Sequence, residues 1–363
     1  MSKRAVFNVT VAGTNITTAL MPVLLGLRVS DKVGTHTDSA DLEIDDTDGR
    51  IVLPRKGAKV SIGLGWESEG MRVVFRGTVD EVKSSGNRSS GRRLKITAKG
   101  MDTTSPVKEG QQRNWDDASV EVIIRDAAGF AGISNIEIDP ALRSLTRTYF
   151  EMRDESFIAM GERLAREIGA NFRIVDDTVI LSKRNADYQA AVRAVWGENL
   201  HSWDITPQLG RPQFSEVRAR WYDVASAGWQ MVQRGTGLDV RAIHAARLSR
   251  ADATEATQQT DSDAATAERD AGEGTVTIEG NTAAVPDGLC VVAGTRAGVD
   301  GSYRIEAVTH TLTRGGGFVT SLDLKQPQGG AGSDAREATT APVAPNAVNR
   351  TPPNIDPDST GTF

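Results

Sequence analysis

The chain has 363 residues, of which 39% are hydrophobic and 25% are charged, and its formal net charge is -6. At roughly 150 residues per domain this length predicts two or three domains, and the composition is that of a globular protein, not of a fibre. Acidic and basic residues are interleaved along the chain, which argues against stable nucleic-acid binding because phosphate-binding surfaces carry clustered cations.

The beginning of the chain, MSKRAVFNVTVAG, alternates apolar and polar residues, so no signal peptide is expected. The most apolar run, residues 19–27, contains Pro22 and is shorter than the roughly 20 residues of a membrane span. Cys290 is the only cysteine, which excludes an internal disulfide and a multi-cysteine metal site. These features fit a soluble chain made in a reducing cytoplasm.

Residues 1–105 are predicted to form an antiparallel β-sandwich or barrel. Segments such as SADLEID and KVSIGLGW place apolar residues at every second position, and turns rich in Gly, Asn and Ser separate them. The densest group of cations also lies here, at Arg92, Arg93, Lys95 and Lys99. The simplest interpretation of this group is the solvated face of a strand.

A small α/β unit is predicted over residues 106–192, and its first helix lies in DDASVEVIIRDAAGFAG. Apolar residues recur at helical spacing at Val120, Ile123, Ile124 and Ala127. Asp116, Asp117 or Ser119 could cap the start of this helix. Gly129 or Gly132 could end it.

The second helix of this unit is predicted in DESFIAMGERLAREIGANFRIVDDTVILSKR. Its apolar stripe comprises Phe157, Met160, Leu164 and Ile168. Asp154 or Ser156 could cap the helix, and Gly169 is the expected stop. The rest of the segment alternates at Phe172, Ile174, Val179 and Leu181 around a turn at Asp176 and Asp177. A hairpin is therefore expected directly after the helix.

A second β region is predicted over residues 193–326, beginning with strands such as FSEVRARWYD. The Ala-rich, polar segment near residues 249–273 could be a surface helix or a loop. Residues 327–363 are predicted to be an extended, disordered tail, because this Pro-rich and Gly-rich segment has few apolar residues to bury. Both a dispensable tail and a strap that docks on a partner fit this composition.

No catalytic, cofactor-binding or metal-binding residue is predicted. The four histidines lack the spacing of a zinc site, and no nucleophile elbow or phosphate loop occurs. His310 reads as a packed residue inside a strand, and Cys290 reads as a small buried hydrophobic residue. The acidic pairs Asp176–Asp177 and Asp154–Glu155 could in principle serve a glycosidase, but such pairs arise by chance among 48 acids. The six tryptophans are expected to anchor cores or subunit interfaces.

The order of several segments resembles a known family. These segments are RNWDDASVEVIIRDAAGFAGI, TYFEMRDESFIAMGERLAREIGANFRIVDDTVILSKR, FSEVRARWYD, DAATAERDAG and GSYRIEAVTHTLTRG. Together, over roughly residues 5–325, they resemble the late control protein D family, the baseplate hub proteins of contractile-tailed phages. Gly301, Tyr303, Ile305, Val308 and His310 match the Gly-x-Tyr-x-Ile-x-x-Val-x-His strand of that family.

This resemblance implies a mainly β fold in which two tail-tube-like antiparallel β-barrels, residues 1–105 and 193–326, flank the α/β insertion. It also implies a homotrimer without enzymatic activity or cofactor, which joins a sixfold tail tube to a threefold spike and passes DNA through its lumen. Its expected partners are the spike, the tube, neighbouring baseplate proteins and the tape-measure protein. The expected location is the virion, after assembly in the host cytoplasm.

Two alternatives belong to other classes. Related hubs occur in type VI secretion spikes and other contractile injection systems, so this chain could belong to such a particle. A tail-associated peptidoglycan hydrolase is the other alternative, and the lack of a recognisable acid or nucleophile constellation argues against it.

The α/β unit is expected to brace the hub against its surroundings.

Overall fold

The computed structural model describes residues 3–33, 38–89, 91–101, 106–175, 177–184, 191–208, 213–238 and 240–332. Residues 1–333 form one compact unit, and strands dominate it, which confirms the mainly β fold with an α+β insertion. Residues 327–332, predicted as the start of the tail, are instead ordered, because β21 runs to Gln328 and the N–H of Gly332 donates to the carbonyl of Gly298, and the rest of the predicted tail lies outside the described residues. Among the described helices, none is both long enough and apolar enough to cross a bilayer.

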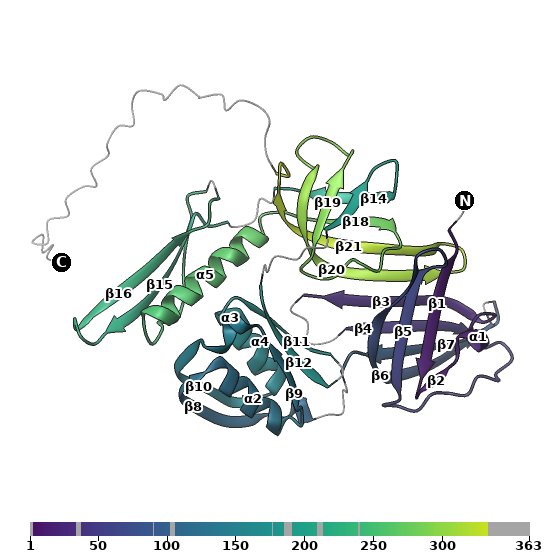
Figure 1. Cartoon of the computed structure of the whole chain (residues 1–363), viewed down its shortest axis with the longest axis horizontal. Helices are drawn as coiled ribbons and strands as arrows, with labels where there is room; N and C mark the ends of the chain where they lie inside the picture. The colour runs from purple at the N-terminus through teal and green to yellow at the C-terminus, as the bar shows by residue number, and fades with distance from the viewer. Residues whose placement is uncertain are drawn as a thin grey trace, which may run out of the picture. The chain divides into compact units, whose positions relative to one another are not determined.

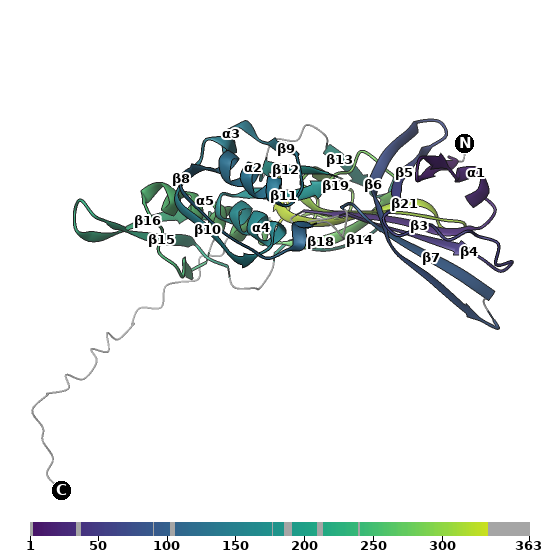
Figure 2. The ribbon, with the colours of Figure 1, turned by 90° about the horizontal axis from the view of Figure 1, so that it is seen from below.

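The first β region contains seven strands and one short helix. They are β1 (Ala5–Val11), β2 (Thr14–Asn15), α1 (Thr17–Leu20), β3 (Leu24–Lys32), β4 (Ser39–Asp45), β5 (Lys59–Trp66), β6 (Gly70–Asn87) and β7 (Gly91–Lys99). The strand order is β3-β4-β7-β6-β5-β1-β2, and β6 and β7 continue as a long hairpin (Figure 2). Alternation places Ala40, Leu42 and Ile44 of β4 in the core, as the sequence predicted.

The second β region contains six strands. They are β13 (Ala191–Val195), β14 (Leu200–Thr206), β18 (Glu273–Glu279), β19 (Leu289–Ala293), β20 (Gly301–Thr313) and β21 (Gly317–Gln328). Their pairing order is β13-β19-β20-β21-β18-β14, in which β13 and β19 run parallel. The core of this region includes Tyr303, whose hydroxyl donates a hydrogen bond to the carbonyl of Val299 at 2.6 Å.

The two β regions are joined into one 13-stranded sheet, because β20 pairs with β3 (Figure 1). The cores also meet at this joint: the Trp66 indole donates to the carbonyl of Gly280 at 2.7 Å, and its ring lies 5.4 Å from Phe318. The sequence indicated two barrels but gave no sign that they share a sheet. The division into separate barrel domains stays a prediction.

The α/β unit contains the two helices and the hairpin that the sequence predicted: α2 (Val120–Phe130), α4 (Phe157–Glu167), β11 (Ala170–Val175) and β12 (Thr178–Lys183). Ser119 and Ser156 are the caps, because their hydroxyls accept the backbone N–H groups of Val122 and Ala159. Gly169 follows α4 with a φ of 66°, a left-handed conformation that glycine adopts without a Cβ clash.

Other parts of this unit differ from the prediction. Asp116 and Asp117, proposed as caps, lie instead in strand β8 (Gln111–Ser119), which pairs with β10 (Thr146–Glu155). Strand β9 (Asn135–Ile138) runs parallel to β12, and the short helices η1 (Pro106–Lys108) and α3 (Pro140–Arg143) complete the unit. The β8–β10 pair was missed because its apolar residues, such as Trp115 and Phe150, do not recur regularly enough along the sequence.

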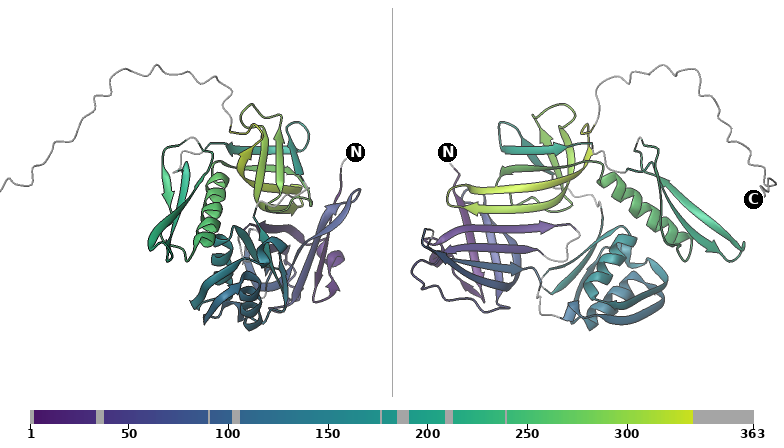
Figure 3. Two further views of the ribbon diagram at one scale, coloured as in Figure 1. Left: turned by 60° about the vertical axis from the view of Figure 1, so that its left-hand side comes forward. Right: turned by 180° about the vertical axis from the view of Figure 1, so that it is seen from behind.

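The segment FSEVRARWYD is a strand, as predicted, but it does not belong to the second β region. It forms β15 (Glu216–Asp223), which pairs with β16 (Gly228–Gly235) and β17 (Ile243–Ala245) in a separate three-stranded sheet. The Ala-rich segment is helix α5 (Ala253–Arg269), which lies along this sheet (Figure 3). We call β15, β16, β17 and α5 the arm. Alternation identified the buried face of the strand but could not identify the sheet to which it belongs.

Candidate assembly surfaces

The residues considered for chemistry are packed inside the second β region. The Cys290 side chain is fully buried, and burial raises the pKa of its thiol to about 12. His310 is buried with Nδ1 3.0 Å from the Thr320 hydroxyl, and burial lowers the pKa of its imidazole to about 4. Among the described residues, no three His, Cys, Asp or Glu side chains gather as a metal site would require.

The acidic pairs have local structural partners. Asp154 accepts a hydrogen bond from the Gln112 amide at 2.8 Å, and Glu155 pairs with Arg163 at 2.7 Å. Asp177 lies at the turn between β11 and β12, whereas Asp176 lies outside the described residues. Asp154 and Glu155 therefore each have a structural role, which requires no substrate.

The basic group on β7 faces acids of the neighbouring strand β4. Arg93 pairs with Glu43 at 2.7 Å and Lys95 with Asp41 at 3.3 Å, and both cations are exposed. This is the solvated strand face that the sequence predicted. Exposed pairs of this kind contribute little to stability and show no phosphate-binding geometry.

Two of the strands at the ends of the 13-stranded sheet are β14 and β1. Strand β13, which pairs with β19, is a further end, and Leu200 at the start of β14 bridges to Trp196. Among the described strands, β14 pairs only with β18, and β1 meets β2 only through its last two residues. Beside β14, the Trp196 ring is 51% exposed and lies edge-on to Trp203, with ring centroids 4.7 Å apart. Open strand edges are templates for pairing with another chain, so the edges of β14 and β1 are candidate assembly surfaces.

The arm carries a third candidate surface on the side of its sheet that faces away from α5. Because side chains alternate, Arg220, Tyr222, Trp229, Met231 and Ile243 share this side, and we call these five residues the arm face. Trp229 is 61% exposed, its ring lies edge-on to Tyr222 at 5.4 Å, and the Arg220 guanidinium lies 5.3 Å from the ring centroid. Sequence reasoning missed this surface, although large residues on both faces of FSEVRARWYD were a signal of it.

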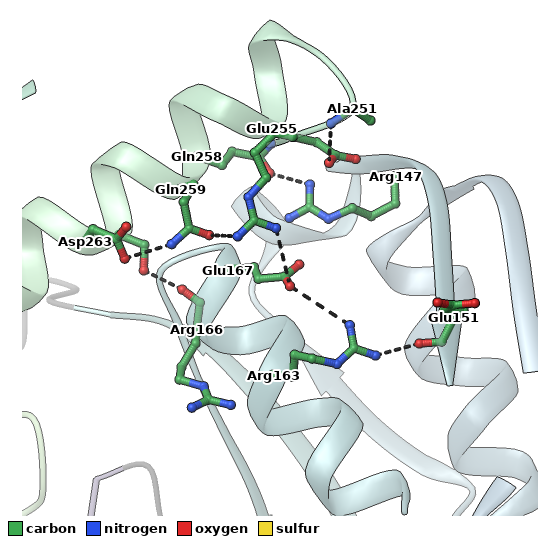
Figure 4. A network of polar contacts seen from close by, with 12 residues as sticks. Arg147, Glu151, Arg163, Arg166, Glu167, Ala251, Glu255, Gln258, Gln259 and Asp263 are labelled. Carbon is green, nitrogen blue, oxygen red and sulfur yellow. Dashed lines mark hydrogen bonds and ion pairs between the residues drawn. The ribbon is translucent and has the colours of Figure 1, made fainter. Parts of the chain in front are cut away.

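Polar side chains join the arm to the α/β unit (Figure 4). Buried Arg147 of β10 donates to the Gln258 side chain of α5 at 2.6 Å, and burial lowers the pKa of this guanidinium. Arg250, just before α5, lies 3.6 Å from Glu167 of α4. Ser262 of α5 donates to the carbonyl of Arg166 on α4 at 2.5 Å, while Arg163 of α4 bonds to the carbonyl of Glu151 within the α/β unit. The arm therefore docks on the α/β unit through hydrogen bonds and ion pairs.

A second polar joint connects the α/β unit to the first β region. Arg173 of β11 lies 3.5 Å from the Asp31 carboxylate at the end of β3. Asp38, directly before β4, lies beside Asp31, and burial together with the Asp31 charge raises the pKa of Asp38 to about 8. A protonated Asp38 carboxyl can donate a hydrogen bond to the buried Asp31 Oδ1. If Asp38 is ionised, Asp31 Oδ1 has no hydrogen-bond donor.

The chain was compared with known proteins, and no family model matches it. The probable baseplate hub protein of Escherichia phage 186 is 25% identical over 224 residues, which is 61% of this chain and 55% of that protein. The corresponding protein of Escherichia phage P2 is 25% identical over 218 residues, covering 59% and 54%. This chain resembles phage baseplate hub proteins. It spans about half the length of these curated relatives.

Solved structures with the same fold are also components of tails and injection machines. The 43 kDa tail protein of prophage MuSo2 from Shewanella oneidensis has a TM-score of 0.68 at 14% identity, covering 88% of this chain and 98% of that chain. The E. coli c3393 protein, a component of the type VI secretion system, has a TM-score of 0.54 at 12% identity, covering 90% and 79%. The predicted resemblance to hub proteins is confirmed by the hub relatives, and these structures confirm the fold.

Proposed function

We propose that this chain is the structural baseplate hub of a contractile phage tail. The observation that carries the proposal is the 13-stranded sheet, which joins two β regions through β20 and β3 and, among the described strands, leaves an edge of β14 and an edge of β1 largely unpaired. A chain with two such regions can occupy two places in a ring, so three chains supply six. That stoichiometry suits an adaptor between a sixfold tail tube and a threefold spike.

The two open edges supply a way to close the ring. Strands β1 and β14 are both seven residues long. Pairing β14 of one copy with β1 of the next would continue the sheet around the assembly and cover both edges. Such an interface joins unlike surfaces of neighbouring copies, as a closed threefold ring requires.

In a baseplate hub, the α/β unit, the C-terminal segment and the lumen would each have a distinct role. The α/β unit braces the ring against neighbouring baseplate proteins, and the segment after residue 326 binds the spike. The lumen passes DNA during injection, for which a net charge of -6 is suitable because it disfavours tight phosphate contacts. The curated relatives are named as hub proteins, which favours a structural role over the alternative of a peptidoglycan hydrolase.

A hub or spike subunit of a type VI-like injection system is the second candidate function. The observation that favours it is the shared fold with the E. coli type VI secretion component, at a TM-score of 0.54. The sequence matches to phage hub proteins favour the phage tail over this candidate.

The experiment is light scattering coupled to size-exclusion chromatography, on the chain alone and with the spike protein from the same particle. We expect either a trimer or a monomer that forms a three-to-three complex with the spike. A chain that stays monomeric in both samples would contradict the adaptor role, and murein digestion would then test the hydrolase alternative.

A further inference from the structure

The sheet part of the arm, residues 213–250, has an unusual composition for a surface segment. Residues 213–250 contain six arginines, no lysine and three acids, so their net charge is +3 and the rest of the chain carries -9. Of the sixteen large hydrophobic residues that are exposed among the described residues, six lie in this segment. Arg, Trp, Tyr and Met are enriched where proteins bind one another, whereas Lys is depleted there.

Among the residues that the structure describes, no helix or strand covers the arm face. Helix α5 packs against the other side of the sheet, where Val217 and Ala219 are buried. On the arm face, Met231 is 54% exposed and Ile243 is 47% exposed. The side chain of Arg220 has no acidic partner among the described ion pairs and rests on the Trp229 ring. An aromatic and apolar face with a free cation fits a partner surface that is apolar and acidic.

Two observations point to a second copy of this chain as the occupant. The arm leaves the main sheet directly after β14, and the amide of Gln213 donates to the carbonyl of Ala271 at 3.3 Å, next to the start of β18. A copy that pairs with the open edge of β14 would therefore lie beside the base of the arm. The charge agrees for the sheet part of the arm, because residues 213–250 carry +3 and the chain outside these residues carries -9.

We propose that the arm face binds an acidic, apolar surface of the next copy of this chain and so reinforces the contact made at the edge of β14. The inference rests on the proposed trimeric hub. It assigns to the arm the role of a clamp between protomers, in addition to the sheet-edge contact.

The first test measures assembly. Trp229→Ala combined with Met231→Ala, and separately Arg220→Glu, should weaken trimer formation about tenfold or more per interface, because truncating central aromatic residues of interfaces has effects of this size. Phe130→Ala is the matched control, since Phe130 is 51% exposed on α2, outside the arm. Sedimentation over a range of concentrations measures the effect, and circular dichroism of the monomer checks the fold.

The second test measures contact at the arm face directly. In the Met231→Cys variant, the added thiol is the reactive one, because Cys290 is fully buried. Maleimide labelling should be fast in the monomer and slowed at least tenfold in the assembled trimer, whether the trimer forms alone or with the spike. The Phe130→Cys variant should label equally in both states.

The outcomes separate the two proposals. A trimer that tolerates the arm variants and leaves the M231C thiol reactive overturns the arm interface but not the hub. Protection that a different protein confers on the monomeric chain, before any trimer forms, assigns the arm face to that protein and also overturns the inference. A chain that never assembles overturns both.

Discussion

Helices α4 and α5 each lie on a three-stranded sheet, yet they are held there by different interactions. On α4, Phe157, Met160 and Leu164 are fully buried against its sheet and the neighbouring elements. On α5, the most buried residues are small or polar, and they include Ala256 and Thr260. One helix belongs to an apolar core, and the other is joined by close packing and hydrogen bonds.

The difference indicates how much free energy it costs to separate each helix from the residues that it contacts. Burying large apolar side chains contributes roughly 25 cal/mol per Å² of apolar surface removed from water. Helix α4 can therefore be separated from its sheet only by opening the apolar core between them. A protein hydrogen bond contributes only about 1 kcal/mol net, because water replaces it when the contact opens. The arm is therefore held to the rest of the chain mainly by polar contacts, which include the buried ion pairs of Arg269 on α5 with Asp287 and Glu306 at 2.9 Å.

The largest expected effect is the loss of a large apolar side chain from α4, which should cost far more stability than a substitution in α5. Phe157→Ala removes a ring that lies edge-on to Phe172 at 5.5 Å and should lower the free energy of unfolding by about 3–5 kcal/mol. Thr260→Ala in α5 is the matched control, with an expected loss of about 1 kcal/mol. Urea unfolding followed by circular dichroism measures both, and similar losses for the two variants would refute the distinction.

The same difference explains which elements could be predicted from the sequence. The stripe of large apolar residues on α4 predicted the helix, its cap Ser156 and its stop Gly169. The corresponding positions on α5 hold Ala, Thr and Ser, which give no apolar periodicity, so a helix and a loop were equally compatible with the sequence. In β10, buried Arg147 interrupts the strand pattern, because its environment is set by Gln258, 111 residues away.

Assembly surfaces were harder to predict than elements. The alternation of Val217, Ala219 and Trp221 predicted a strand correctly, but alternation carries no information on which strands pair. The free edge of β14 and the arm face could therefore be recognised only from the strand order in the structure. The roles of His310 and Cys290 were easier to predict, since an apolar strand context indicates burial regardless of topology.

A smaller effect is expected when the polar joint of the arm loses one partner. Gln258→Ala leaves the guanidinium of Arg147, which is 3% exposed, without its side-chain acceptor, and should cost about 1.5–3 kcal/mol. Hydrogen exchange should become faster in α5 and β15 while α4 stays protected. Gln258→Glu keeps an acceptor and should retain most of the stability. Unchanged exchange in the Gln258→Ala variant would show that the hydrogen bond does not hold the arm.

The smallest effect within its test range, pH 7 to pH 8.5, concerns the joint between Arg173 of the α/β unit and the Asp31–Asp38 pair. The pKa of Asp38 is about 8 in the folded chain, whereas an unperturbed aspartate has a pKa of 3.8, so between these values the folded state holds the extra proton. The free energy of unfolding should therefore fall as pH rises through this window, by at most about 1.4 kcal/mol per pH unit from this one proton. Asp38→Asn keeps a donor toward Asp31 and should remove this slope.

The choice of pH range isolates Asp38 from His310. The pKa of His310 is lowered from 6.5 to about 4 in the folded chain, so His310 raises stability as pH increases between those values and opposes Asp38 there. Above about pH 7 the His310 contribution is complete and constant. Urea unfolding between pH 7 and pH 8.5 should therefore show the Asp38→Asn variant gaining on the wild-type chain as pH rises. Parallel curves for the two proteins over that range would mean that Asp38 is already ionised at pH 7, and that Arg173 balances both carboxylates at the joint.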